Sequence, residues 1–412
     1  MELYKKGFFH IFLGSILNKL FAFISSVIIV RLISKTDYAS LTYTDNIYSY
    51  VTLFAGFGMS SAILKYCSSD NQKKNKAYFK IALKYGSIVQ IGIVLIVLLY
   101  ISIIDIPFSG AKELILIYCF YPIIEYLLSV IYNIVRSLLK NKLYATMSVI
   151  QTSIVMTLGI IFVLGTGTKG ILIARYIAVV IVVSLGAFFV KKEFKNVEDI
   201  KLEKSEIKSF MIMAISLLIA NIFSMIMPLN ETFLINNLIR DEAITANYKV
   251  AVMLPSQLSF ITSSIITYYF PIIARMKNKS IIWKNSVKIG RITSIILLGI
   301  SIIGIGFSKI IILFIYGEKY LDAIGISKIF WIVYFFNAGF RMIPMNILPA
   351  IGKTKFNAFM AIISCIIHFY LDYFMISNYG ISGVAVATSV VYMLSGIGYW
   401  IYLYICCKRE NI

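Results

Sequence analysis

Four cationic side chains lie inside apolar segments that are each long enough to cross a membrane. Lys19 lies in the middle of the first segment, beside Asn18, and Arg341 lies towards one end of the tenth. Lys249 and Arg175 lie near the ends of the eighth and sixth segments. A charged side chain at membrane depth is costly, so it usually faces the protein interior or water and has a partner. We expect each cation to line a polar cavity, to pair with a buried carboxylate, or to extend to the membrane interface.

Acidic side chains within apolar segments are fewer. They are Glu125 in the fourth segment, Glu231 in the seventh and Asp372 in the eleventh, with Asp45 near one end of the second. A carboxylate at this depth can bind a proton or a sodium ion. Glu231 is the best candidate because amide and hydroxyl side chains flank it, and a structural ion pair with a lysine is the alternative. His368, one helical turn before Asp372, is either a proton relay or a hydrogen-bonded core residue.

Prolines interrupt several apolar segments. Each removes a backbone hydrogen bond and favours a kink. Pro228 lies just before Glu231, and Pro255 and Pro344 lie within the eighth and tenth segments. We predict that these three residues bend helices that open and close a cavity; plain kinks without a gating role are the alternative.

The elements that position these residues are membrane-spanning helices. Hydrophobic residues make up 59% of the 412 residues and charged residues 14%, far below the soluble average of about 25%. Apolar runs of membrane-spanning length recur throughout the chain, which indicates an all-α polytopic membrane protein. The predicted spans are residues 8–30, 41–64, 79–104, 113–135, 143–165, 170–190, 209–236, 244–270, 287–308, 323–349, 355–377 and 383–406.

Lysine and arginine residues alternate between the two sides of this arrangement. Of 39 such residues, 27 lie in both termini and every second loop, whereas 8 lie in the other loops. Because basic residues favour the cytoplasmic side, we predict twelve spans with both termini in the cytoplasm. This topology explains the net charge of +20 better than binding to nucleic acid does.

A repeated stretch indicates two duplicated halves. Residues 140–174 and 353–387 align without gaps at an offset of 213, with 10 identical pairs among 35. Paired lysines begin each copy, and the paired glycines Gly167/Gly380 and Gly170/Gly383 mark a turn between two helices. With six spans in each half, the halves are parallel repeats related by an axis along the membrane normal, with a substrate site expected between them.

The longest polar stretch divides these halves. We predict a six-helix lobe at residues 1–190, a cytoplasmic linker at 191–208 and a second six-helix lobe at 209–412. The five cysteines have neither disulfide nor metal-site spacing, and there is no Walker motif. We expect no cofactor and no metal.

Several loose motifs occur in order along the chain. They are R-L-I-S-K-T-D-Y-A-S from Arg31, F-G-M-S-S-A-I-L-K-Y from Phe57, Y-G-E-K-Y-L-D-A from Tyr316, and Y-G-I-S-G-V-A-V-A-T from Tyr379. With these motifs the chain resembles the twelve-helix, Wzx-type O-antigen flippases of the multidrug/oligosaccharidyl-lipid/polysaccharide (MOP) exporter superfamily, which are MATE-like in fold.

The resemblance implies transport rather than catalysis. Its implied substrate is an undecaprenyl-pyrophosphate-linked oligosaccharide, carried from the cytoplasmic to the periplasmic leaflet of the bacterial inner membrane. Lys19, Arg341, Lys249 and Arg175 would then face the pyrophosphate, because an unpaired diphosphate in hydrocarbon is prohibitively costly. Glu231, Asp372, Glu125 and Asp45 would couple transport to protons or sodium. The implied partners are membrane lipids, an O-antigen polymerase and a chain-length regulator.

Two other functions remain open. A drug exporter of the same superfamily would have an acidic cavity for cationic drugs, whereas a cationic cavity fits a lipid pyrophosphate. A membrane-bound O-antigen polymerase or glycosyltransferase would carry a large catalytic loop, and no outside loop predicted here is long enough.

Overall fold

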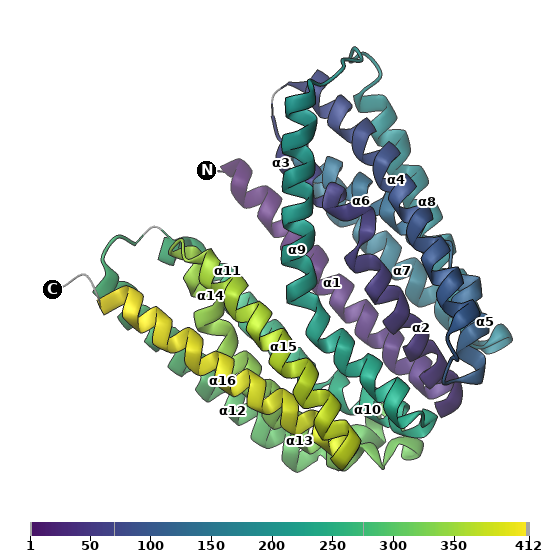
Figure 1. Cartoon of the computed structure of the whole chain (residues 1–412), viewed down its shortest axis with the longest axis vertical. Helices are drawn as coiled ribbons and strands as arrows, with labels where there is room; N and C mark the ends of the chain where they lie inside the picture. The colour runs from purple at the N-terminus through teal and green to yellow at the C-terminus, as the bar shows by residue number, and fades with distance from the viewer. Residues whose placement is uncertain (1, 70, 275, 409–412) are drawn as a thin grey trace. The chain divides into compact units, whose positions relative to one another are not determined.

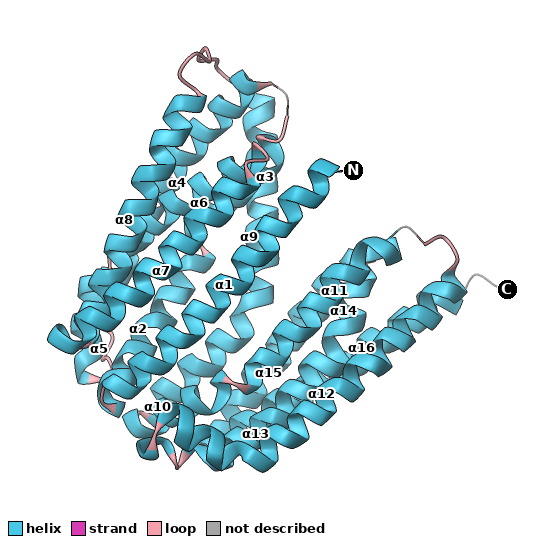
Figure 2. Cartoon of the chain, turned by 180° about the vertical axis from the view of Figure 1, so that it is seen from behind, coloured by secondary structure: helices cyan, strands magenta, loops and turns pink. Residues whose placement is uncertain are grey.

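A computed structural model describes residues 2–69, 71–274 and 276–408 of the chain. Every regular element in this part is a helix (Figure 2). Eleven helices are long and apolar enough to cross a membrane, or twelve if α5 and α6, which meet at a bend of 48°, form one span. The protein is therefore a multi-pass helical membrane protein, as the hydropathy of the sequence predicts.

The chain forms two compact units, residues 1–225 and 226–412, which divide within helix α9. The division falls beyond the 191–208 segment that we predict as a linker. Figure 1 labels the α-helices. The helices of the first unit are α1 (Glu2–Leu32), α2 (Lys35–Leu53), η1 (Ala55–Gly58), α3 (Met59–Tyr66), α4 (Gln72–Ile103), α5 (Ser109–Tyr118), α6 (Tyr121–Ser137), α7 (Asn141–Thr166), α8 (Thr168–Glu193) and the first part of α9 (Lys204–Leu234).

The second unit repeats the same order of elements. After the end of α9 come η2 (Ile235–Ile239), α10 (Glu242–Met253), η3 (Pro255–Gln257), α11 (Leu258–Ala274), α12 (Lys279–Tyr316), η4 (Glu318–Tyr320), α13 (Ala323–Phe335), η5 (Phe336–Arg341), α14 (Met342–Ala350), α15 (Thr354–Tyr379) and α16 (Ile381–Lys408). The second span is broken in both units, into α2 and α3 or into α10 and α11. The fourth span bends by 48° between α5 and α6 in the first unit, whereas in the second unit α13 continues through the π-helical turn η5 into α14.

The repeated stretch has the same backbone geometry in both units. Gly167 ends α7 with φ 61° and ψ −142°, and Gly380 ends α15 with φ 60° and ψ −146°. These left-handed values favour glycine because a Cβ atom would be strained there. At Gly170 and Gly383 an added Cβ atom would lie 2.5 and 2.3 Å from a carbonyl oxygen of the preceding helix. The paired glycines therefore serve the same tight turn.

Apolar side chains lie both in the interior and on the outer faces, as in a membrane-spanning helix bundle. A large apolar core joins the helices of the first unit, and several smaller cores join those of the second. On the outer faces of long helices, large apolar side chains remain exposed, including Ile96 at 65%, Phe188 at 74% and Phe314 at 81%. Exposed apolar surface of this extent indicates contact with lipid.

The three prolines that we predict to bend helices lie in different local backbone structures. Pro255 begins the single turn η3 that separates α10 from α11. Pro344 is the third residue of α14, directly after the π-helical turn η5. Pro228 lies within α9, which continues to Leu234 before the π-helical turn η2. All three lie at or near irregular backbone, and their gating role remains a prediction.

Candidate functional site

The second unit buries a cluster of ionisable and polar side chains among α9, α10, α15 and α16. The members of this buried ionisable cluster are Glu231, Tyr248, Lys249, His368, Asp372 and Thr388. Apolar residues of the same helices surround it. Two of its members, Glu231 and Asp372, are residues for which the sequence predicts ion coupling.

Glu231 is held by a hydrogen bond from a tyrosine. Its side chain is 5% exposed, and the Tyr248 hydroxyl donates to Oε1 at 2.6 Å. The Tyr248 ring in turn contacts the edge of Phe330, with ring centroids 5.6 Å apart. Glu231 also interacts electrostatically with Asp372 and His368. The two buried carboxylates therefore share one electrostatic environment.

His368 and Asp372 form a close pair on one face of α15. The exposed fractions of the two residues are 1% and 0%, and His368 Nδ1 lies 2.9 Å from Asp372 Oδ2. The Thr388 hydroxyl donates to the carbonyl of Val384 and lies 3.2 Å from His368 Nε2. Because the threonine proton is already used, Nε2 must be the donor in that contact. Neither oxygen of Asp372 has an aligned hydrogen-bond donor in the described part of the chain.

The cationic member of the cluster is Lys249 on α10. The Lys249 ammonium donates to the Thr232 hydroxyl at 3.0 Å and lies 5.9 Å from the centre of the Tyr248 ring. It also interacts electrostatically with Glu231. Lys249 thus belongs to the same network as Glu231, which is a predicted coupling residue. The site therefore contains a basic side chain as well as acidic ones.

Arg341 lies at the end of η5 in the second unit. Its Nη1 donates to Asn337 Oδ1 at 3.1 Å, and its guanidinium lies 5.0 Å from the centre of the Tyr392 ring. Its Nε is buried without a hydrogen-bond partner, and no carboxylate pairs with it, among residues 2–69, 71–274 and 276–408. Arg341 is therefore a partly buried cation held by neutral groups.

Arg175 and Asp45 neutralise each other in the first unit. The guanidinium makes two parallel contacts with the carboxylate, Nη1 to Oδ1 at 2.5 Å and Nη2 to Oδ2 at 3.0 Å. Nη1 also lies 3.3 Å from the Tyr118 hydroxyl. Of the alternatives stated for Arg175, the structure thus has the pair with a carboxylate. This ion pair links α8 to α2, and each side chain neutralises the charge of the other.

Lys19 has an exposed side chain on α1. Its neighbour Asn18 donates to the Ser148 hydroxyl at 2.6 Å, which fixes that side of α1 against α7. Since successive residues on a helix point about 100° apart, Lys19 turns away from this contact. It remains a candidate cavity cation.

The first unit contains a polar cavity of about 410 Å³ beside the break between α2 and α3. Glu125 contributes a carboxylate to its wall, and Glu125 Oε2 is buried without a hydrogen-bond partner among the described residues. Other polar side chains of the wall are Tyr48, Thr52, Ser60, Ser61, Gln90, Tyr126, Ser129 and Asn221. Glu125 is thus separate from the buried ionisable cluster, and lines a cavity of its own unit.

Gln90 secures the backbone around this cavity. Its side-chain carbonyl accepts from the Gly56 amide at 3.2 Å, and its amide donates to the Pro122 carbonyl at 3.1 Å. Gln90 is fully buried. It therefore replaces hydrogen bonds that the broken backbone at Gly56 and the bend at Pro122 would otherwise lack.

The neutral members of both sites are not predictable from the sequence, with the exception of Gln90. Tyr248 and Thr388 satisfy charged groups from neighbouring helices, and a contact across helices has no sequence signal. Gln90 was detectable, because it is an isolated amide within the apolar run of α4. In the described part of the chain, no group of three or more His, Cys, Asp or Glu residues could hold a metal ion.

Comparisons with known proteins agree with this architecture. The sequence model of the family described as "Polysaccharide biosynthesis protein" matches residues 4–277. A Shigella flexneri protein named "Putative O-antigen transporter" is 26% identical over 250 residues, which cover 60% of this chain and 58% of that protein. The chain thus aligns with less than two thirds of that relative.

Solved structures show the same fold. An inward-facing multidrug-resistance MATE-family transporter of the MOP superfamily superimposes with a TM-score of 0.76 at 15% identity, covering 96% of each chain. The lipid II flippase MurJ, in an inward closed conformation, superimposes with a TM-score of 0.77 at 18% identity, covering 95% of this chain and 86% of the other. At sequence identities of 15% and 18%, these comparisons show a shared fold and nothing beyond it.

The prediction that the chain is not an enzyme is confirmed by its family together with the fold it shares with transporters. The predicted resemblance is confirmed as well. The chain belongs to the polysaccharide biosynthesis protein family and has the fold of a MOP-superfamily transporter.

Proposed function

We propose that this protein translocates undecaprenyl-pyrophosphate-linked O-antigen repeat units from the cytoplasmic to the periplasmic leaflet of the bacterial inner membrane by alternating access. Family membership and the name of the Shigella flexneri relative support a role in polysaccharide transport. The substrate is a lipid-linked oligosaccharide, whose diphosphate must pass through a low-dielectric region in contact with cations.

The environment of Arg341 carries this proposal. The guanidinium is kept in an apolar helix bundle with contacts to Asn337 and Tyr392 but with no carboxylate partner in the described residues. A buried charge without a counter-ion is costly unless a ligand supplies one. Arginine is suited to phosphate because its planar fork donates two parallel hydrogen bonds. We assign Arg341 to the diphosphate, with Lys249 and the exposed Lys19 as further cations.

The proposed topology has twelve spans and both termini in the cytoplasm. It is supported by the alternation of basic loops and by the matching glycine turns at Gly167 and Gly380. The two six-helix halves are then parallel repeats, joined through the cytoplasmic segment 191–208. The O-antigen polymerase and the chain-length regulator are the proposed protein partners.

We further propose that the buried ionisable cluster couples transport to an ion gradient. His368 Nε2 is a donor to Thr388 and Nδ1 faces Asp372 Oδ2 at 2.9 Å, so a proton taken up at this pair would lie between the two side chains. Glu231, with one oxygen bonded to Tyr248, lies close enough to respond to that proton. Loss or gain of a proton, or its exchange for sodium, would change the charge between α9 and α15. Glu125 is a second candidate, and Asp45 is not, because Arg175 occupies its carboxylate.

Bending at irregular backbone would transmit that change. The cluster lies beside η2, which follows Pro228, and Arg341 ends η5, which precedes Pro344. Irregular helical turns are frequent at functional sites and need little rearrangement to bend. We propose that these turns, and the break at Pro255, are the hinges of alternating access.

A cation-coupled drug exporter is the second candidate, favoured by the buried carboxylates Glu231 and Asp372 and the fold shared with a MATE transporter. Deletion of the gene separates the two. The proposal expects loss of surface O-polysaccharide and accumulation of lipid-linked repeat units, both restored by the wild-type gene. Unchanged surface polysaccharide with increased sensitivity to cationic drugs would instead identify a drug exporter.

A further inference from the structure

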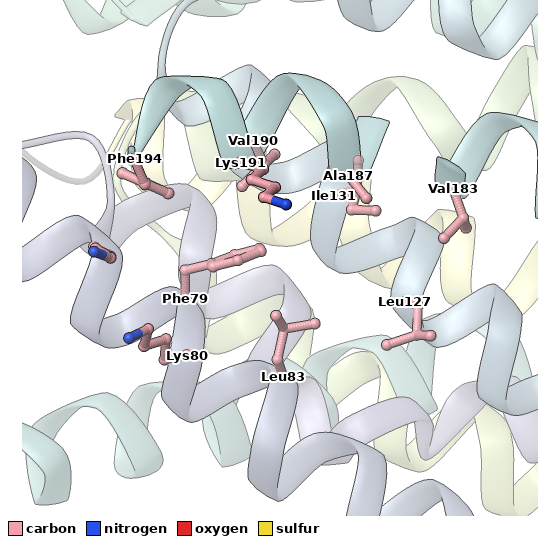
Figure 3. A pocket seen from close by; sticks show the side chains of 11 residues that line it. Phe79, Lys80, Leu83, Leu127, Ile131, Val183, Ala187, Val190, Lys191 and Phe194 are labelled. Atoms are coloured by element: carbon pink, nitrogen blue, oxygen red, sulfur yellow. The ribbon is translucent and has the colours of Figure 1, made fainter. Parts of the chain in front are cut away.

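An apolar groove of about 310 Å³ opens between α4, α6 and α8 of the first unit. Its floor is formed by apolar side chains from all three helices, among them Leu83, Leu127 and Ala187 (Figure 3). Phe79 and Phe194 contact each other beside it, with ring centroids 5.9 Å apart. Its floor lies within the predicted spans, whereas Lys76, Lys191 and Phe194 lie just outside them, so the groove extends from the hydrocarbon region towards the membrane surface.

Three lysines line the groove at its Phe194 end. Lys76 and Lys80, from α4, share one carboxylate, that of Asp199, at 3.0 and 2.6 Å. Lys191, from α8, is exposed and has no ion-pair partner among the residues that the structure describes. Three positive charges against one negative charge leave this end of the groove cationic, while Leu127 and Val183 make the opposite end apolar (Figure 3).

A ligand that matches both ends must be an anionic amphiphile. Basic pockets between membrane helices bind anionic lipid headgroups, and each lysine near the surface adds to the attraction. The lysine stems also pack on apolar surface while their ammonium groups reach the headgroup region. A groove of about 310 Å³ accommodates part of one acyl chain.

We propose that the groove is a binding site for an anionic phospholipid of the bilayer, with an acyl chain on the apolar floor and the phosphate between Lys80 and Lys191. The bound lipid would join α4 to α8 at the end where the 191–208 segment also attaches to α4. This site is independent of the proposed transport function, because it involves none of the residues assigned to the substrate or to ion coupling.

Native mass spectrometry of the full chain, purified in mild detergent from a membrane containing phosphatidylethanolamine, phosphatidylglycerol and cardiolipin, tests the proposal. The wild type is expected to retain phosphatidylglycerol or cardiolipin in preference to phosphatidylethanolamine. The double variant Lys80→Gln/Lys191→Gln should retain roughly one tenth as much of the lipid adduct as the wild type. The matched control Lys84→Gln/Lys192→Gln removes the same charge from the same two helices, outside the groove, and should retain it.

A second pair of variants tests the apolar floor without changing charge. Ala187→Trp fills the groove and should also remove the adduct, whereas Leu185→Trp, on an exposed part of α8 outside the groove, should not. Equal retention of the adduct by Lys80→Gln/Lys191→Gln and its control would overturn the proposal. So would a preference for phosphatidylethanolamine, or an adduct with the mass of a polyprenyl diphosphate.

Discussion

His368 Nδ1 lies 2.9 Å from Asp372 Oδ2 in a site where neither residue is more than 1% exposed. Among the described residues, neither Nδ1 nor either carboxylate oxygen makes a hydrogen bond of regular geometry, so the two side chains are in close polar contact without an aligned donor. Thr388 fixes the other ring nitrogen as a donor. This pair is the part of the buried ionisable cluster to which we assign the binding of a coupling proton or sodium ion.

We predict that Asp372→Asn abolishes the dependence of transport on an ion gradient. The amide has the same shape but cannot exchange a proton, and it forms no ionic contact with His368. Gradient-driven uptake by proteoliposomes should fall about tenfold or more, while downhill exchange is retained. The control Asn378→Asp, on the exposed part of the same helix, should behave as wild type. Gradient-dependent transport by Asp372→Asn would remove Asp372 from the coupling mechanism.

Arg175 and Asp45 should be coupled energetically but not functionally. Each single substitution, Arg175→Gln or Asp45→Asn, leaves a partly buried charge without its partner and should destabilise the protein by about 1–3 kcal/mol. The double variant should recover part of that loss, since no unpaired charge remains. Thermal unfolding in detergent measures the cycle. Additive effects of the two substitutions would mean that the contact is not energetically important.

Gly58 should be intolerant of substitution. Its φ is 78°, and an added Cβ atom would lie 2.1 Å from the Ala214 carbonyl oxygen on α9. Gly58→Ala is expected to cost about 1–2 kcal/mol from the left-handed backbone alone, and more from the contact. Gly92→Ala, in α4 with open space around it, is the matched control and should stabilise by up to about 1 kcal/mol. Equal melting temperatures for the two variants would contradict this reading of the break between α2 and α3.

The attachment of the 191–208 segment to α4 should weaken in acid. Hydrogen bonds from Lys80 and Lys76 hold the pKa of Asp199 below its usual value, and Lys73 lowers the pKa of Glu198 in the same way. Because these pKa values are lower in the folded state, the contacts stabilise the attachment fully above the usual value of 3.8 for Asp199, and this stabilisation is lost as the pH falls through the lower folded value.

Accessibility of the segment to a cross-linker or a protease measures this change. It should rise below about pH 4 in the wild type. In Asp199→Asn it should already be raised at neutral pH and change less on acidification. An identical pH profile in wild type and variant would show that Asp199 does not hold the segment.

Much of the fold followed from hydropathy, charge and the internal repeat. Long apolar segments and basic loops identify membrane-spanning helices reliably, so the helical segments lie where the sequence predicts them. The break at Gly56–Gly58 was missed because glycine has many roles, and its need here comes from Tyr126 and α9, which are distant in sequence. Sequence could also place Arg175 and Asp45 within spans, but only the packing of α8 on α2 shows that they pair. His368 and Asp372 are one turn apart, which is why their proximity was predictable.

The central claim is that Arg341 binds the diphosphate of a lipid-linked oligosaccharide during its translocation. The most direct test reconstitutes the protein in vesicles with a labelled undecaprenyl-pyrophosphate oligosaccharide, and measures how fast the sugar moves between leaflets by its accessibility to an external enzyme. We predict rapid translocation by wild type and by Arg291→Gln, an exposed arginine of the same unit. Arg341→Gln should be roughly a hundredfold slower at unchanged folding, and Arg341→Lys intermediate. Wild-type rates in Arg341→Gln, or extrusion of a cationic drug with no movement of the lipid-linked sugar, would contradict the account.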